Sequence, residues 1–202
     1  MTLMRAVLHK GRERISLEAL VALDVTADLK VSLQYIRDSS FHFCGGSILN
    51  EYYVITAAHC VENEIAADII IVAGIVNLNH PYLSVTRTIE QIISHKEYNP
   101  NNSLNDIALI KVFTPFKSSG NIGFVTLPKQ DEAVQQGTVA RFSGFSQRES
   151  EVLQQVTIYI TDQEYCKNIF NTSPRNIYDI HICANNTNIN RGTYKVSCEE
   201  DI

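Results

Sequence analysis

The amino-acid sequence predicts an all-β protein, and two observations lead to that prediction. From residue 30 onward, short runs of β-branched and aromatic residues alternate with Asn, Asp, Gly and Pro, at the spacing expected of small barrels. The first half alone holds enough such runs to close a barrel. With 202 residues, 45% of them hydrophobic, the chain can form one sizeable domain or two small packed halves.

The first half of the chain contains six candidate strands. Each is a short run rich in Val, Ile, Leu, Tyr or Phe that ends at turn-forming residues. We expect these strands at residues 31–35, 41–49, 53–56, 69–73, 83–89 and 107–111.

The second half is expected to be shorter of strands. Candidate strands lie at 138–143, 153–160 and near 181–184, with a helix at 161–170. Thr161 or Asp162 could cap this helix, and both alternatives stay open at this point. So few strands would leave a second barrel unclosed, with apolar faces and open edges in water.

Charge and hydropathy exclude two classes of partner. The formal net charge is −5, and no Lys/Arg run would bind phosphates, so no nucleic acid is expected. Apolar runs stay well short of the roughly 18 to 20 residues that a membrane-spanning helix needs, so no membrane is expected either. We expect a monomer.

The chain has five cysteines, at positions 44, 60, 166, 183 and 198. Because there is no Cys-x-x-Cys pair and no His/Cys cluster at zinc spacing, we expect no metal and no other cofactor. Two disulfides and one remaining thiol are the natural interpretation, which indicates an oxidising compartment.

The first 29 residues are atypical of a secreted protein. The apolar run 17–23 is short, contains Glu18 and follows the charged run 9–14, so it does not form a convincing signal peptide. Either the true start is missing or this form is not secreted. Asn-x-Ser/Thr sequons begin at Asn101, Asn171 and Asn185; glycosylation and chance occurrence both remain open.

Three motifs point to a catalytic histidine. They are Cys-Gly-Gly-Ser at 44–47, Thr-Ala-Ala-His-Cys at 56–60 and Asn-Asp-Ile-Ala-Leu at 105–109. In this order they resemble the chymotrypsin/trypsin family of serine endopeptidases, over about residues 31–201. The resemblance implies two six-stranded antiparallel Greek-key barrels in a domain at 30–202, the first at about 30–115 and a partial second at about 120–202.

The resemblance also implies roles for particular residues. His59 would be the general base and Asp106 the buried carboxylate that orients it. Disulfides would join Cys44 to Cys60 and Cys166 to Cys183, leaving Cys198 without its family partner. The remaining histidines lack matching neighbours and are expected at the surface or in loops: His9, His42, His80, His95 and His181.

The nucleophile of the family has no counterpart at the aligned position. The resemblance places Ile202 where the family has its serine, and Val196 at the floor of the specificity pocket, an apolar residue that favours an apolar substrate side chain. The Arg14–Ile15 bond lies near the family's activation site but lacks the following glycines, so activation there is not expected.

Three interpretations follow from these departures. The first is a secreted serine endopeptidase whose sequence is incomplete at both ends: the full product would hydrolyse peptide bonds, and residues 1–202 are inactive as given because the serine is absent. The second is a non-catalytic protease homologue that binds or regulates a partner protease. The third is a fragment that does not fold stably.

Overall fold

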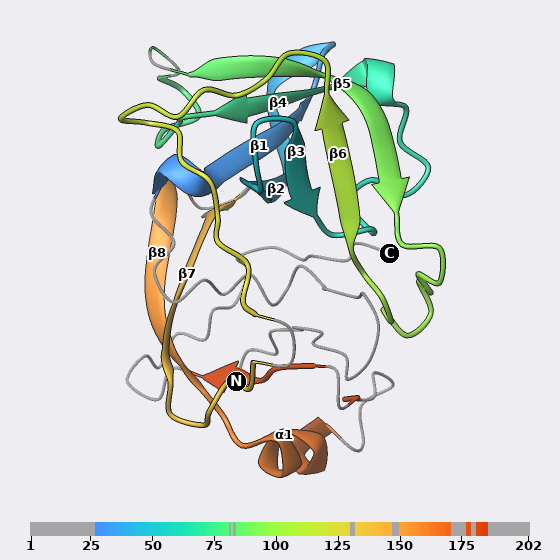
Figure 1. Ribbon diagram of the computed structural model, residues 1–202, viewed down its shortest axis with the longest axis vertical. Coiled ribbons are helices and arrows are strands. Elements are labelled where there is room, and N and C mark those ends of the chain that lie inside the picture. Colours follow the sequence, from blue (N-terminus) through green and yellow to red (C-terminus); the bar gives the residue numbers. More distant parts are fainter. Residues whose placement is uncertain are drawn as a thin grey trace.

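The computed structural model describes residues 27–80, 82, 84–129, 132–146, 150–170, 177–178 and 181–185. Within these ranges the protein has a closed six-stranded barrel and a three-stranded sheet, with one α-helix at the far end of that sheet (Figure 1). The prediction of an all-β protein with a closed first barrel is therefore confirmed.

The barrel contains the first six strands of the described chain. They are β1 (Lys30–Tyr35), β2 (Asp38–Ile48), β3 (Tyr53–Thr56), β4 (Ile69–Ala73), β5 (Val85–Ser94) and β6 (Ala108–Val112). Their order around the barrel is β1-β2-β3-β6-β5-β4, every neighbouring pair is antiparallel, and β4 closes the barrel onto β1. Short 3-10 turns at Ala27–Leu29 and Ala66–Asp68 precede β1 and β4.

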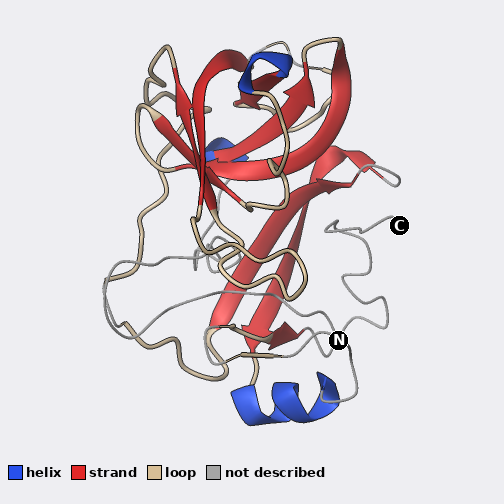
Figure 2. Ribbon diagram, turned by 90° about the vertical axis from the view of Figure 1, so that its right-hand side faces the viewer, coloured by secondary structure: helices blue, strands red, loops and turns tan. Residues whose placement is uncertain are grey.

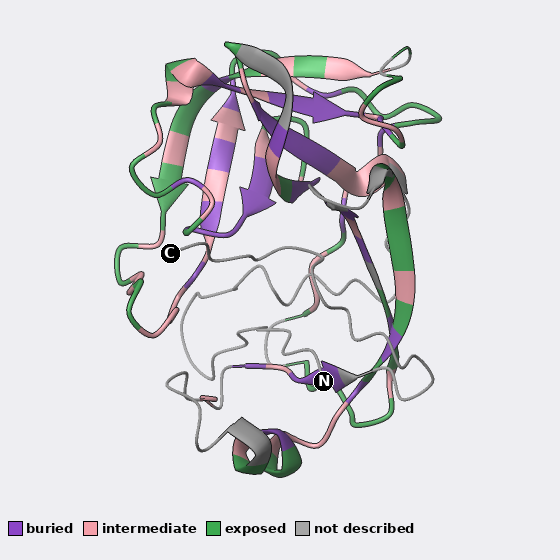
Figure 3. Cartoon of the chain, turned by 180° about the vertical axis from the view of Figure 1, so that it is seen from behind, coloured by how far each residue is buried: buried purple, intermediate pink, exposed green. Residues whose placement is uncertain are grey.

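The barrel interior is filled by aliphatic side chains. In β1, Val31 and Leu33 point into this core, and Ser32 and Gln34 lie on the opposite face, as the two-residue period of a strand requires. Figure 3 shows the buried residues concentrated in the barrel strands. The core includes Val31, Leu33, Ile48, Val54, Ile69, Ile71, Ile110, Val112 and Phe116.

The second sheet consists of a long hairpin and one short strand. It is formed by β7 (Val139–Ser146), β8 (Ser150–Ile160) and β9 (Ala184–Asn185). Figure 2 shows the hairpin running from the barrel to the helix. The expected incompleteness of a second barrel depends on segments outside the described residues, so it stays a prediction.

The helix α1 (Gln163–Phe170) begins two residues after the expected start at 161 and ends where expected, and Asp162 is its cap. The Asp162 Oδ1 atom accepts a hydrogen bond of 2.8 Å from the backbone N–H of Tyr165, which is the usual capping contact. A disulfide between Cys166 and Cys183 joins the helix to the segment that leads into β9. None of the helices in the described part of the chain has the length and apolar character to cross a membrane.

Candidate active site

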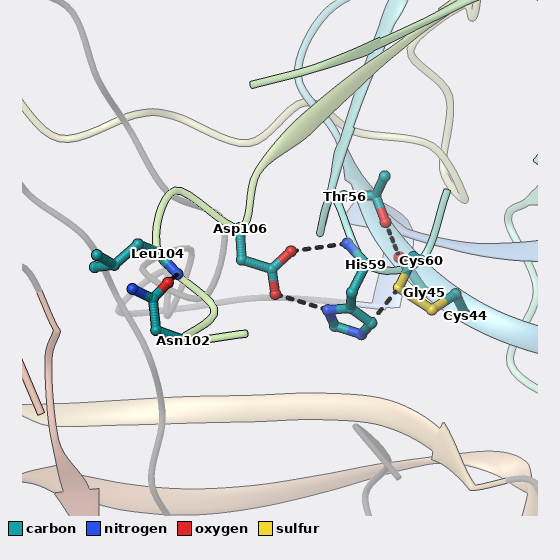
Figure 4. A network of polar contacts seen from close by, with 8 residues as sticks. All are labelled: Cys44, Gly45, Thr56, His59, Cys60, Asn102, Leu104 and Asp106. Atoms are coloured by element: carbon teal, nitrogen blue, oxygen red, sulfur yellow. Dashed lines mark hydrogen bonds and ion pairs between the residues drawn. A yellow bond between two sulfur atoms is a disulfide. The ribbon is translucent and has the colours of Figure 1, made fainter. Parts of the chain in front are cut away.

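The loop after β3 positions His59. Ala57 and Ala58 are buried, and the N–H groups of Cys60 and Val61 donate back to their carbonyls at 3.3 and 3.1 Å, forming a tight turn. At the end of β3, the Thr56 hydroxyl donates a 2.8 Å hydrogen bond to the carbonyl of Gly45 in β2 (Figure 4). Small side chains are needed in this turn because it packs directly against the barrel wall.

Asp106 reaches the histidine because of strand pairing. Strand β3 ends at Thr56, β6 begins at Ala108, and these two residues are antiparallel partners. The chain therefore leaves β3 toward His59 and enters β6 from Asp106 at the same edge of the barrel. Residues 47 positions apart are brought into contact in this way.

Two hydrogen bonds join Asp106 to His59. The backbone N–H of His59 donates to Oδ1 at 2.8 Å, and the ring Nδ1–H donates to Oδ2 at 2.7 Å. Asp106 is 3% exposed, whereas the His59 side chain is 34% exposed. Because a carboxylate only accepts hydrogen bonds, the proton of the neutral ring lies on Nδ1, and Nε2 carries the lone pair.

Asn105 helps to position Asp106, and this role of Asn105 was not predicted from the sequence. Its backbone lies in the left-handed region with φ of 57°, a conformation that Asn tolerates better than most residues. Its side-chain Nδ2 donates to the carbonyl of Glu97 at 2.9 Å. The turn before β6 is thus fixed to the neighbouring loop immediately before the carboxylate.

A disulfide lies beside the imidazole. The sulfurs of Cys44 and Cys60 are bonded, which connects the histidine turn to β2, and His59 Nε2 lies 3.5 Å from Cys60 Sγ. Gly46 lies two residues after Cys44 in β2, and a glycine is needed there for packing. A Cβ at this position would lie 2.8 Å from the carbonyl oxygen of Ile55. The expectation of disulfides is supported at both bridges that the structure describes.

Comparison with known proteins gives the family. The family model described as "Trypsin" matches residues 25–194. The chain belongs to the trypsin family. It is 33% identical over 150 residues to a trypsin of Sarcophaga bullata, which covers 71% of this chain and 58% of that protein. It is 32% identical over 187 residues to trypsin Blo t 3 of Blomia tropicalis, covering 89% of this chain and 67% of the relative.

A mammalian member is similar to the same degree. Serine protease 1 of Canis lupus familiaris is 32% identical over 152 residues, covering 69% of this chain and 57% of that protein. The chain thus spans between 57% and 67% of the length of these three trypsin-family relatives.

In this member of the trypsin family, His42 lies in the interior, and the prediction of a surface or loop position was wrong. It is in β2, is 6% exposed, and its Nδ1 lies 2.8 Å from Ser32 Oγ. Its ring meets the edge of Phe145, in β7, with 5.3 Å between ring centroids. Burial lowers the pKa of His42 from 6.5 to about 4, because water no longer solvates the charged ring.

Several predicted positions lie outside the described residues. These are Ile202, Val196, Cys198, Asn171, and the segment at Arg14–Ile15. Of the other sequons, Asn101 is exposed in a turn, and Asn185 is the last residue of β9.

Proposed function

We propose that this is a serine-type endopeptidase domain in which His59 is the general base and Asp106 is the carboxylate that orients it. The observation that carries the proposal is the pair of hydrogen bonds from His59 to the buried Asp106. They hold the ring so that Nε2 can take the proton of an attacking hydroxyl and later give it to the leaving amine. Asp106 stabilises the imidazolium that exists between those two steps.

The nucleophile decides whether a polypeptide of residues 1–202 can act alone. The family resemblance aligns Ile202 with the serine, and an aliphatic side chain cannot attack a carbonyl. Loss of the nucleophile in such a triad lowers turnover about a million-fold. Residues 1–202 by themselves are therefore expected to have no peptidase activity.

A second candidate function follows from Ile202, which the resemblance aligns with the serine of the family. A protease-like domain without a serine can still bind a protein or peptide, as a regulator of a partner protease. In either case two disulfides favour an oxidising, extracellular compartment. The resemblance aligns Val196 with the floor of the specificity pocket, and an apolar residue there favours substrates with an apolar side chain. We expect the domain to be monomeric.

The test compares two polypeptides with casein and chromogenic peptides as substrates. Purified 1–202 should give no hydrolysis above the buffer rate. A product of the same gene that continues into a Gly-Asp-Ser-Gly-Gly segment should hydrolyse peptides and lose activity about a million-fold on His59→Ala.

The outcomes separate the two candidates. Hydrolysis by 1–202 that disappears in His59→Ala would overturn the assignment of an inactive polypeptide. Absence of any serine-bearing product, together with a change in the rate of a partner protease on adding 1–202, would favour the regulatory function.

A further inference from the structure

The loop between β5 and β6 carries an Asn-x-Ser sequon in a closed turn. Residues 95–107 form this loop, and Asn99 and Leu104 within it are partners in an isolated antiparallel bridge. The N–H of Asn99 donates to the carbonyl of Leu104 at 3.0 Å. The turn that this bridge closes contains the sequon, which begins at Asn101 and ends at Ser103.

Neighbouring side chains, and not that of Asn101, shape this turn. Asn99 Oδ1 accepts a hydrogen bond of 3.0 Å from the N–H of Asn101. Asn102 Oδ1 accepts one of 3.1 Å from the N–H of Leu104. Asn101 is exposed, and its own side chain forms no hydrogen bond within the part of the chain that the structure describes. A group attached to its Nδ2 atom would therefore break no contact on which the turn depends.

The turn distinguishes Asn101 from the other sequon whose asparagine the structure describes. Asn185 is the last residue of β9, where it is the antiparallel partner of Tyr159 in β8. An oligosaccharide is bulky and polar, so it needs open space around the asparagine, which surface loops and turns provide. Of these two positions, Asn101 therefore fits a glycan better.

The disulfides indicate the compartment in which such a modification takes place. The described part of the chain holds the bridges Cys44–Cys60 and Cys166–Cys183. Bonds of this kind form in oxidising compartments such as the lumen of the endoplasmic reticulum. Because sequons receive their oligosaccharides in the same lumen, a chain that forms its bridges there also meets the enzyme that glycosylates it.

We propose that Asn101 carries an N-linked oligosaccharide. In the transfer, Asn101 Nδ2 forms a bond to the anomeric carbon of the first sugar of a lipid-diphosphate-linked oligosaccharide. The bond from that carbon to the diphosphate oxygen breaks, the lipid diphosphate leaves with the electron pair, and one proton leaves Nδ2. No oxidant or reductant is needed. This inference goes beyond the peptidase assignment and does not need it, since its test measures attached sugar.

A glycan at Asn101 would stand on the loop that supplies the carboxylate of the candidate active site. Asp106 follows Asn101 by five residues, a stretch of chain that spans at most about 18 Å. Figure 4 shows Asp106 between Asn102 and Leu104 of this loop on one side and His59 on the other. A large partner that approaches the site over this loop would therefore meet the glycan first.

The experiment uses residues 1–202 behind a cleavable secretory leader, produced in insect cells. Cleavage after Lys96 and Lys111 releases the peptide 97–111, which contains the sequon. We expect this peptide to carry the added mass of N-acetylhexosamine and hexose units. Peptide N-glycosidase in heavy-oxygen water should remove the sugar and convert Asn101 into a labelled aspartate, which fragmentation locates among the other asparagines of the peptide.

Three variants separate this sequon from the others. Asn101→Gln and Ser103→Ala should each leave the peptide 97–111 without sugar, because each removes one end of the sequon. The matched control is Asn102→Gln, which changes an asparagine of the same turn but keeps the sequon, so its glycan should remain. A parent protein in which this peptide is entirely unmodified, or sugar that persists on it in Ser103→Ala, would overturn the proposal.

A second measurement covers variants that fold too poorly to be secreted. The same chains are translated in the presence of microsomal membranes, where the sugar is transferred before folding is complete. Gel mobility before and after endoglycosidase treatment then counts the glycans on each chain. One glycan fewer in Asn101→Gln than in the parent and in Asn102→Gln supports the site. The same number in all three chains overturns it.

Discussion

Thr56 and Ala108 are antiparallel partners across β3 and β6, and this one pairing brings His59 and Asp106 together. A shift of register by one residue would turn every side chain of the strand to the other face. The contact between base and carboxylate is therefore a property of the barrel as a whole. Changes in the barrel wall should affect both stability and the candidate site.

Gly46→Ala should destabilise the barrel. Its new Cβ would lie 2.8 Å from the carbonyl oxygen of Ile55 and 2.9 Å from Val54 Cγ1. Overpacking of this kind costs about 1 to 3 kcal/mol. Urea denaturation measures the loss, with Gly45→Ala as the matched control, since a Cβ there meets its nearest neighbour at 3.7 Å. Equal stability of the two variants would contradict the packing argument.

Arg87→Lys should also destabilise the barrel. The Nε and Nη2 groups of Arg87 donate to the carbonyl of Pro115 at 3.2 and 2.8 Å, and the guanidinium lies 5.2 Å from the centre of the Phe116 ring. Lysine cannot form the same fork, so we expect a loss of about 1 to 2 kcal/mol in thermal or urea unfolding.

The exposed ion pair of Lys111 with Glu90 provides the comparison for Arg87. Lys111→Gln should lower the unfolding free energy by less than Arg87→Lys does, since water screens such pairs. A larger effect from Lys111→Gln than from Arg87→Lys would contradict this ranking.

Stability should fall between pH 6.5 and pH 4 because of His42. Burial lowers the pKa of this ring to about 4, so in that range the unfolded chain binds a proton that the folded chain excludes. The contribution is fully present above pH 6.5, and about 3 kcal/mol is lost by pH 4. Unfolding free energies measured across this range should decrease less in His42→Gln. Parallel pH profiles for both proteins would refute the assignment.

The sequence predicted the barrel strands well but misplaced the end of β5. A run of β-branched and aromatic residues suggested a strand at 83–89, whereas β5 spans Val85–Ser94. A register shift between Ile89 and Gln91 interrupts the alternation there, as a bulge does. The remaining residues are strand because β6 pairs with them, a long-range cause that a local pattern does not contain.

In the candidate site, too, local motifs predicted some features, and features that depend on residues distant in the sequence were missed. Motifs singled out His59 and Asp106, which the structure brings into contact, and the resemblance paired the cysteines. The burial of His42 was not inferred from the sequence, and one of the groups that its ring packs against is Phe145, a residue of the other sheet. The resemblance did pair Cys44 with Cys60, the residue next to His59, and only the 3.5 Å distance from His59 Nε2 to Cys60 Sγ had to come from the structure.

Proton NMR of His59 tests the central claim most directly, because it needs neither substrate nor nucleophile. In residues 1–202, the Nδ1–H donated to Asp106 at 2.7 Å should give a strongly downfield resonance that persists through titration of the ring. Asp106→Asn should remove this resonance, because the neutral amide no longer requires a donor on Nδ1. A His59 ring with no downfield proton in the parent protein, or the same spectrum in Asp106→Asn, would contradict the account.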